Sequence, residues 1–384
     1  MTAKPMIETI QGQVDDNVID LGVGHPKTSH LPLSRLYQAV QERFAARDAY
    51  FLQYGAEQGD GYLRIGLGRF LSQGYETEVR PESIFITCGA SSGLDLACSL
   101  FTRPGDVVFV EEPTYFLALK VFADHQLNPV AIPVDEEGLV LDALEAALTS
   151  HQAKILYTVP TFQNPSGCTL SMERRERLVG LSREHGFLIL ADEVYHFLHY
   201  TDPPPKAMGA FANQGNVTSL GSFSKILAPG LRMGWILTDE ERLQRLVNSG
   251  LLASGGGMNP FTSAMVRGLL ENGELKANIL DLRVDYRQRM LAMESALRNH
   301  LPCVRFRRPA GGYFYWVEFP GDCDAEKLLD HAQSYQVSYK PGRHFSSRGE
   351  LRSFARLCFT YYEPPELEEG IQRLGQALNS FLGG

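Results

Sequence analysis

Continuous apolar segments alternate with segments of helical periodicity over most of the chain. The runs SIFITCG (83–89), DVVFVEEP (106–113) and AKILYTVP (153–160) are apolar without strict alternation, which is typical of strands buried on both faces. The charged, amphipathic segment MERRERLVGLSREHG (172–186) ends in His-Gly, a pair that favours a helix C-terminus. This alternation predicts an α/β fold whose mostly parallel sheet is covered by helices on both faces.

The C-terminal third has a different pattern. A long helical segment (278–302) is followed by shorter strand-like runs, GGYFYWVEFP (311–320) and LRSFARLCFTYY (351–362), and by a last helix (364–382). These elements predict a second, smaller α+β domain. The pattern of the first domain begins only after about residue 30, so we assign residues 31–275 to a large domain and residues 1–30 with 276–384 to the small domain.

Composition narrows the possible partners and the compartment. The 384 residues carry a formal net charge of −9, which argues against nucleic acid as the main partner because such proteins need a basic surface. The six cysteines form no CxxC pair, as in proteins that keep their thiols reduced. No apolar run approaches membrane-spanning length, and residues 1–16 lack the apolar core of a signal peptide. We therefore expect a cytoplasmic protein without a membrane or nucleic-acid partner.

Candidate chemistry collects where predicted strands end. Ligands of open α/β sheets bind outside the carboxyl ends of the strands. The residues that directly follow predicted strands are Gly89 to Ser92, Tyr115, Asn164, Asp192, Tyr195 and Lys225. We expect them to line one crevice.

The segment LGSFSKILAPGLRMGW (220–235) combines an amine, two hydroxyls and a guanidinium. Lys225 has few charged neighbours in sequence, and a lysine in an apolar setting near a cation loses proton affinity and becomes a nucleophile that condenses with an aldehyde. Ser222, Ser224 and Arg232 suit a phosphate ester. The turn CGASSGLD (88–95) adds backbone N–H groups at a predicted helix N-terminus.

Other strand-end residues suit a pyridine ring. Asp192 ends an apolar strand and can keep a ring nitrogen protonated, although a helix cap or an ion pair with Arg232 is an alternative. Tyr195 and Asn164 can hydrogen-bond a ring hydroxyl, and for Asn164 a turn role is the alternative. Tyr115 can stack on the ring or serve as an ordinary core residue. Together with the lysine and the anion-binding groups, these residues match pyridoxal 5'-phosphate.

Three segments, YTVPTFQNPSG (157–167), ILADEVY (189–195) and SFSKILAPGLRMGW (222–235), occur in an order and spacing that resemble a known family. The chain resembles the fold-type I pyridoxal-phosphate enzymes of the class I/II aminotransferase family. It is most similar to the branch that holds 2-aminoadipate and kynurenine aminotransferases and the aminotransferase-like half of MocR-type regulators. The resemblance implies a large domain with a mixed, mostly parallel seven-stranded sheet between helices, plus a smaller α+β domain.

The resemblance also implies roles for individual residues. The catalytic residues are Lys225, which forms the internal aldimine and moves the substrate α-proton, Asp192, which pairs with the pyridine nitrogen, and Tyr195, which contacts the ring hydroxyl together with Asn164. The remaining cofactor contacts are Tyr115 on the ring and Gly89, Ala90, Ser91, Ser222, Ser224 and Arg232 at the phosphate.

The substrate site and the assembly follow from the same resemblance. Arg356 is expected to bind the substrate α-carboxylate, with Gly24 and Asn164 lining the same pocket. Tyr54 is expected to reach the phosphate of a neighbouring subunit, which implies a homodimer with shared active sites.

Two features depart from the family pattern. Ala90 stands where relatives often carry a serine or threonine, so we expect Ser91 or Ser92 to supply the missing hydroxyl. The segment before IDLGVGHP (19–26) has only 18 residues, so substrate specificity cannot be carried over from relatives that select substrates with an element there.

We expect an aminotransferase that moves an amino group from an α-amino acid to a 2-oxo acid by a ping-pong mechanism through a Lys225 aldimine. A pyridoxal-phosphate lyase, cyclase or decarboxylase is the alternative, because the cofactor residues do not decide between these outcomes. An effector-binding module is a further reading, and a nicotinamide enzyme is disfavoured because LGVGHP lacks a third glycine at the right offset. His196 and His199 have no third ligand nearby in sequence, so no metal is expected.

Overall fold

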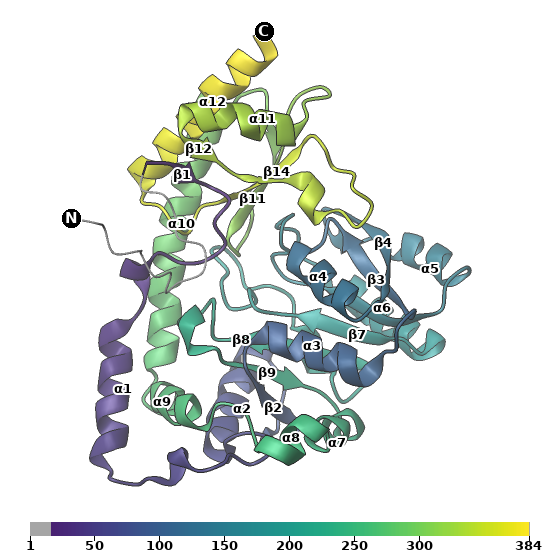
Figure 1. Cartoon of the computed structure of the whole chain (residues 1–384), viewed down its shortest axis with the longest axis vertical. Helices are drawn as coiled ribbons and strands as arrows, with labels where there is room; N and C mark the ends of the chain where they lie inside the picture. The colour runs from purple at the N-terminus through teal and green to yellow at the C-terminus, as the bar shows by residue number, and fades with distance from the viewer. Residues whose placement is uncertain (1–16, 384) are drawn as a thin grey trace, which may run out of the picture.

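The centre of the molecule is an eight-stranded mixed sheet, seen in a computed structural model that describes residues 17–383 (Figure 1). The strand order is β2-β9-β8-β7-β6-β3-β4-β5, and every neighbouring pair is parallel except those that involve β9 or β5. The strands are β2 (Ile84–Thr87), β3 (Val107–Glu112), β4 (Asn128–Asp135), β5 (Gly138–Leu139), β6 (Ala153–Thr158), β7 (Leu188–Asp192), β8 (Val217–Ser222) and β9 (Gly234–Leu237).

The expected α/β fold is confirmed, but the expected count of seven strands is wrong by one. The additional strand, β5, has two residues and pairs antiparallel with the end of β4. Two residues carry no periodicity that a sequence pattern can report, so this strand is defined only by its hydrogen bonds to β4.

Alternate side chains of the central strands belong to two separate hydrophobic cores. Val108 and Val110 of β3 belong to the larger core, which also contains residues of α3 and α4, whereas Phe109 belongs to a second core with residues of α5 and α6. Successive side chains of a strand point to opposite faces, so helices cover the sheet on both sides. The continuous apolar runs in the sequence follow from this double burial.

The helices around the large sheet begin and end near the expected positions. Helix α6, for example, starts after the N-cap Ser171 and ends at Gly186 in a left-handed conformation. The helices are α2 (Gly61–Tyr75), α3 (Ala90–Phe101), α4 (Phe116–Asp124), α5 (Leu141–Leu148), α6 (Met172–His185), α7 (Glu240–Val247), α8 (Gly250–Gly255) and α9 (Pro260–Glu271).

A second sheet of four antiparallel strands lies above the first in Figure 1. Its order is β10-β11-β14-β13, and the 27-residue helix α10 runs from its base down to α1 and α9. A short parallel pair joins β1, near the start of the described chain, to β12. The elements are β1 (Ile19–Asp20), α1 (Leu33–Ala45), α10 (Glu274–His300), β10 (Arg305–Phe306), β11 (Phe314–Glu318), α11 (Ala325–Ala332), β12 (Val337–Ser338), β13 (Lys340–Pro341), β14 (Phe354–Cys358) and α12 (Pro364–Gly383).

Residues 1–16, which our domain assignment and signal-peptide analysis include, lie outside the described residues, as does residue 384. Among residues 17–383, no helix combines the length and the apolar character that crossing a bilayer requires.

The topology brings the candidate residues to one edge. Because β9 is antiparallel to both β2 and β8, β2 runs in the same direction as β8, β7, β6 and β3. The carboxyl ends of these five strands therefore meet at the same edge of the sheet. Strand β14 of the second sheet brings Arg356 to this edge, where it contacts Asn164.

Candidate active site

Lys225 lies three residues after β8 and its amine is held within the site. Its Nζ donates a hydrogen bond to the carbonyl oxygen of Gly24 at 2.6 Å and lies 5.0 Å from the ring centroid of Tyr313 and 5.9 Å from that of Tyr195. Burial lowers the pKa of Lys225 to about 8, with the nearby Arg356 charge acting in the same direction. About a tenth of this amine is therefore unprotonated at pH 7, far more than for an ordinary lysine, and the unprotonated form is the nucleophile.

Asp192 is the last residue of β7 and is 7% exposed. Its Oδ2 accepts a hydrogen bond from the hydroxyl of Tyr157 at 2.8 Å, while its Oδ1 has no partner among residues 17–383. Burial raises the pKa of Asp192 to about 6. The alternative ion pair with Arg232 does not form, because that guanidinium donates to the carbonyl of Cys88 at 3.1 Å. The free carboxylate oxygen fits a protonated ring nitrogen.

The anion-binding groups converge at the start of α3. Gly89 precedes this helix with a φ of 92°, and a Cβ there would lie 3.1 Å from Nη2 of Arg232. Ser222 Oγ donates to Ser224 Oγ at 2.9 Å. Glycine thus provides both the left-handed conformation and the space that lets the guanidinium approach the helix N-terminus.

Ser91 and Ser92 are the two candidates for the phosphate-binding hydroxyl that Ala90 lacks. Ser92 Oγ lies 3.9 Å from the sulfur of Met258 and is partly buried. Ser91 is exposed in the first turn of α3, directly beside Ala90. Of the two serines, the structure leaves Ser91 accessible to an anion.

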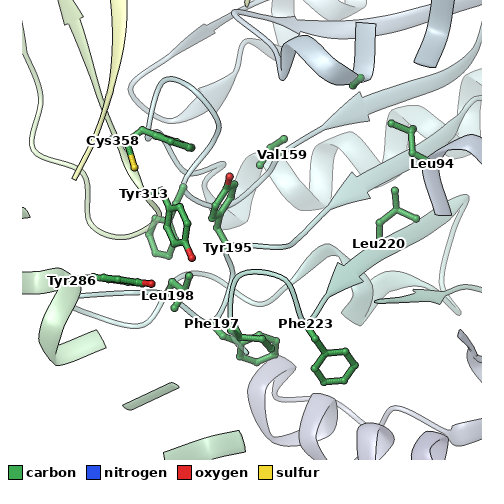
Figure 2. Close-up of a cluster of buried hydrophobic side chains, with 14 of the residues drawn as sticks. Leu94, Val159, Tyr195, Phe197, Leu198, Leu220, Phe223, Tyr286, Tyr313 and Cys358 are labelled. Carbon is green, nitrogen blue, oxygen red and sulfur yellow. The ribbon is translucent and has the colours of Figure 1, made fainter. Parts of the chain in front are cut away.

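Three polar residues lie at the ends of β3, β6 and β7. Tyr115 is the N-cap residue of α4, and burial raises its pKa to about 12, so it is a neutral phenol at physiological pH. Asn164 Oδ1 accepts a hydrogen bond from Arg356 Nη1 at 3.0 Å, which leaves the amide N–H groups of Asn164 free to donate. Tyr195 is 3% exposed, and its ring centroid lies 5.5 Å from that of Tyr313. Figure 2 shows the side chains of Tyr195 and Tyr313 next to each other.

Arg356 is a buried cation without an acidic partner. It is 3% exposed, and no carboxylate lies within ion-pair distance of it among residues 17–383. Its Nη1 and Nη2 donate to Asn164 Oδ1 and to the carbonyl of Gly22, while Nε has no partner within the same part of the chain. Phe314 lies under the guanidinium, 3.9 Å from Cζ to the ring centroid.

Gly24 lies directly beside this guanidinium. A Cβ at position 24 would lie 3.5 Å from Arg356 Nη2, and the carbonyl of Gly24 is the one that receives the Lys225 amine. Burial lowers the pKa of Arg356, but a guanidinium remains protonated in proteins. A buried, permanently charged group with unused donors is a site for a ligand carboxylate.

Tyr54 is not brought to the other candidates within the single chain. It is 84% exposed and lies between η2 (Tyr50–Leu52) and α2, next to the backbone of Gly256. All other predicted site residues lie at the edge described above.

Two contributing residues, Tyr157 and Glu111, are absent from the sequence-based candidates, and a third, Tyr313, is a candidate only for substrate side-chain recognition. Tyr157 orients Asp192 from the adjacent strand, and Tyr313 packs against the Lys225 amine and donates to the carbonyl of Lys225 at 3.2 Å. Glu111, 1% exposed, accepts hydrogen bonds from Val159 N and Gln163 Nε2, each at 3.1 Å, just before Asn164. A polar residue inside an apolar strand run is the only signal that marks Tyr157 and Glu111 in the sequence.

These groups fit pyridoxal 5'-phosphate. The free oxygen of Asp192 suits the pyridine nitrogen, the amine of Lys225 suits the aldehyde, and the Arg232 guanidinium at the N-terminus of α3 suits the phosphate. The donor set therefore agrees with the cofactor that the sequence predicts.

Comparison with known proteins also points to a pyridoxal-phosphate enzyme. Residues 16–374 match the family model described as aminotransferase class I and II. An aromatic-amino-acid aminotransferase of Thermococcus litoralis is 34% identical over 98% of this chain and 92% of that protein. A 2-aminoadipate transaminase of Thermus thermophilus is 31% identical over 95% of this chain and 91% of that protein.

A solved structure shares the fold throughout. The kynurenine aminotransferase of Pyrococcus horikoshii, crystallised in complex with PMP, superposes with a TM-score of 0.90 at 34% identity, covering 95% of this chain and 92% of that one. The chain therefore belongs to the class I and II aminotransferase family and is a pyridoxal-phosphate-dependent transaminase.

Proposed function

We propose that Lys225, Asp192 and Tyr195 are the catalytic residues of an amino transfer between an α-amino acid and a 2-oxo acid. The observation that carries this assignment is the joint position of a lysine with a lowered pKa, an aspartate with a free oxygen and an arginine without an acidic partner. When bound, pyridoxal phosphate supplies the aldehyde and the electron-withdrawing ring.

Separate residues move the proton, protonate the ring nitrogen and contact the ring. The unprotonated Nζ of Lys225 accepts the proton from the substrate α-carbon, for which a pKa of about 8 is well suited. Asp192 holds a proton on the ring nitrogen through its free oxygen. Tyr195 and Asn164 donate to the ring hydroxyl, and Tyr115 stacks on the ring.

Substrate and phosphate binding are assigned to separate groups. Arg356 binds the α-carboxylate with the donors that Asn164 and Gly22 leave unused, and Gly24 and Asn164 line the same pocket. The proposed phosphate site consists of Gly89, Ala90, Ser91, Ser222, Ser224 and Arg232.

The same proposal includes a homodimer in which Tyr54 reaches the phosphate of the partner subunit. It is supported by a group of exposed apolar side chains around Tyr54. Its members are Phe44, Tyr50, Leu52, Leu251 and Phe261, which are 46–68% exposed. Exposed apolar groups of this kind mark interaction surfaces.

The domain division and the location complete the proposal. The parallel pairing of β1 with β12 supports joining the N-terminal segment to residues 276–384 as the small domain, with residues 31–275 as the large domain. The six cysteines, all free thiols, support a reducing compartment such as the cytoplasm.

The family and the named relatives are aminotransferases, so a lyase, cyclase or decarboxylase is not favoured. The names of the relatives refer to aromatic amino acids, 2-aminoadipate and kynurenine, so they do not select one side chain.

The test is amino-group transfer from a panel of donors to 2-oxo acids by the wild-type protein and by Lys225→Ala. We expect kcat to fall about 10²- to 10⁴-fold or more in this variant, because a positioned acid–base group contributes that much. Lys276→Ala, which removes an exposed lysine of α10, is the matched control and should retain full activity. Release of ammonia without an amino acceptor, or unchanged activity of Lys225→Ala, contradicts the proposal.

A further inference from the structure

Two cations lie opposite each other in the smaller sheet. Strands β13 and β14 pair antiparallel, with Lys340 in register with Arg356. Residues directly opposite in such a pair point to the same face, with Cβ atoms about 4.5–5.5 Å apart, and like charges in this position are destabilising. The fold therefore places a second cation beside the proposed carboxylate-binding arginine at a cost in stability.

Both cations converge on the same aromatic ring. The centroid of Phe116 lies 5.7 Å from Nζ of Lys340 and 5.9 Å from Cζ of Arg356. Phe116 directly follows Tyr115, the residue proposed to stack on the cofactor ring. Lys340 is partly buried, so its ammonium lies at the rim of the active site and not in bulk solvent.

The charges around Lys340 do not neutralise it. Within residues 17–383, its Nζ has neither a hydrogen bond nor a carboxylate at ion-pair distance. The nearby acid is Asp20, whose Oδ1 accepts a hydrogen bond from Gly22 N at 2.8 Å, and the other nearby cations are Arg356 and Lys120. The remaining titratable neighbour is His344, exposed on the next turn of the chain.

Positive charge at the site thus exceeds what the cofactor and an α-carboxylate require. Lys225 is assigned to the aldehyde, Arg232 to the phosphate and Arg356 to the α-carboxylate, which leaves Lys340 without an anion. Burial and the Arg356 charge lower the pKa of Lys340, as expected for a cation that lacks a partner in the free protein.

We propose that Lys340 binds a second carboxylate on the substrate side chain, so that dicarboxylic amino acids and dicarboxylic 2-oxo acids are substrates of this enzyme. This inference rests on the proposed function, in which Arg356 binds the α-carboxylate. A lysine has a flexible four-carbon stem, so it can reach a carboxylate that a few methylene groups separate from the one on Arg356.

The first experiment compares Lys340→Met and Lys340→Arg with the wild-type holoenzyme on matched donors, L-glutamate against L-methionine and L-2-aminoadipate against L-norleucine. In Lys340→Met we expect kcat/KM for the acidic donors to fall about 10- to 100-fold, mainly through KM, because a charge-assisted hydrogen bond is lost. The apolar donors should be unaffected or used better, and Lys340→Arg should retain most of the discrimination.

Lys120→Met is the matched control. This variant removes an exposed positive charge near Lys340 that does not belong to the β13–β14 face, so it separates specific binding from general electrostatic attraction. We expect less than about threefold change for either class of donor, because exposed charges contribute little.

The second experiment measures binding without turnover. Glutarate and butyrate are titrated into the holoenzyme by calorimetry, and the preference for glutarate should disappear in Lys340→Met. The inference is overturned if the wild-type enzyme uses only apolar donors, or if Lys340→Met lowers both classes equally. Absence of transfer from every donor instead contradicts the proposed function, while the binding preference still reports on Lys340.

Discussion

Asp192 is buried and Lys225 is partly buried, and both lie where their charged forms are poorly solvated. Desolvation shifts the pKa values of the two residues in opposite directions. The pKa of Asp192 is raised to about 6 and that of Lys225 is lowered to about 8. Desolvation penalises whichever form is charged, so the acid holds its proton more tightly and the amine holds it less tightly. Desolvation of these two proposed catalytic residues therefore lowers the stability of the cofactor-free protein.

This cost predicts that Asp192→Asn stabilises the cofactor-free protein near neutral pH. Between the unfolded pKa of 3.8 and the folded pKa of about 6, the folded state binds the additional proton, so the free energy of unfolding falls as the pH rises through this window. Asp192→Asn has no carboxyl group to titrate, so its free energy of unfolding does not fall in this window. At pH 7 the variant should be more stable than the wild type by up to about 3 kcal/mol, because each unit of pKa difference corresponds to about 1.36 kcal/mol.

The measurement is urea denaturation of both proteins without cofactor at pH 4, 5, 6 and 7. The advantage of the variant should grow up to about pH 6 and then stay constant. Asp202→Asn, at an exposed position, should show no such growth. A variant that is less stable at every pH, or a difference that does not change with pH, means that Asp192 is not penalised by burial.

Lys225 predicts a pH dependence that ordinary lysines do not have. Because its pKa is lowered to about 8, competitive acetylation of the cofactor-free protein with acetic anhydride should show Lys225 reactivity levelling off above about pH 8. The average reactivity of all other lysines serves as the reference, because an ordinary lysine side chain has a pKa of about 10.4 and keeps gaining reactivity above pH 8. A profile of Lys225 that runs parallel to this average contradicts the lowered pKa.

At the scale of elements, the turn after β6 depends on a carboxylate from β3. The two oxygens of Glu111 accept hydrogen bonds from Thr158 Oγ1, Val159 N and Gln163 Nε2. Asn164, which follows Gln163, then contacts Arg356. Glu111 therefore positions the turn that supports the proposed carboxylate-binding arginine.

We predict that Glu111→Gln raises KM for the amino donor about tenfold with a smaller change in kcat. The amide keeps only one acceptor oxygen, so its N–H2 group replaces an oxygen that accepts from one or two of these three donors. An unpaired buried polar group costs about 1–3 kcal/mol. Steady-state kinetics with a single donor separates the two constants. Glu184→Gln, at an exposed position of α6, should behave like the wild type. A tenfold fall in kcat with an unchanged KM contradicts a positioning role.

At the scale of the whole molecule, exposed apolar side chains gather at one end. Phe44 of α1 and Phe261 of α9 lie 6.3 Å apart between ring centroids, and both contact the buried ring of Phe51. Figure 1 shows α1, α9, α2 and α8 at the end of the molecule opposite the C-terminus. This arrangement supports the proposed subunit interface around Tyr54.

Phe261→Asp is expected to give a monomer with little activity, because a buried unpaired charge destabilises an apolar interface and because the partner's Tyr54 is lost from the site. Size-exclusion chromatography with light scattering measures the mass. Leu382→Asp changes a residue of similar exposure on α12, at the other end of the chain, and should remain dimeric. A wild-type monomer with full activity contradicts the shared-site assignment.

The local pattern of apolar and polar residues determined much of the fold of the large domain. Apolar runs predicted β2, β3, β6 and β7 because strands buried on both faces must be apolar throughout. Placing candidate residues directly after those runs predicted the edge at which Lys225, Asp192 and Asn164 meet, because parallel strands end on the same side. The C-terminal boundary of α6 followed from the pair His185-Gly186, and Gly186 is the C-cap of this helix.

Other contacts depend on distances that no local pattern contains. The bond from Tyr157 to Asp192, the bonds from Glu111 to the turn before Asn164, and the register of Lys340 with Arg356 each join elements that are remote in sequence. A register shift of one residue would turn Lys340 to the other face of its sheet. The sequence therefore determined the fold class and the cofactor, and it supplied the proposed reactive residues, through local periodicity and strand ends. Strand pairing and packing decided which side chains orient these residues and where a charge is left without a partner.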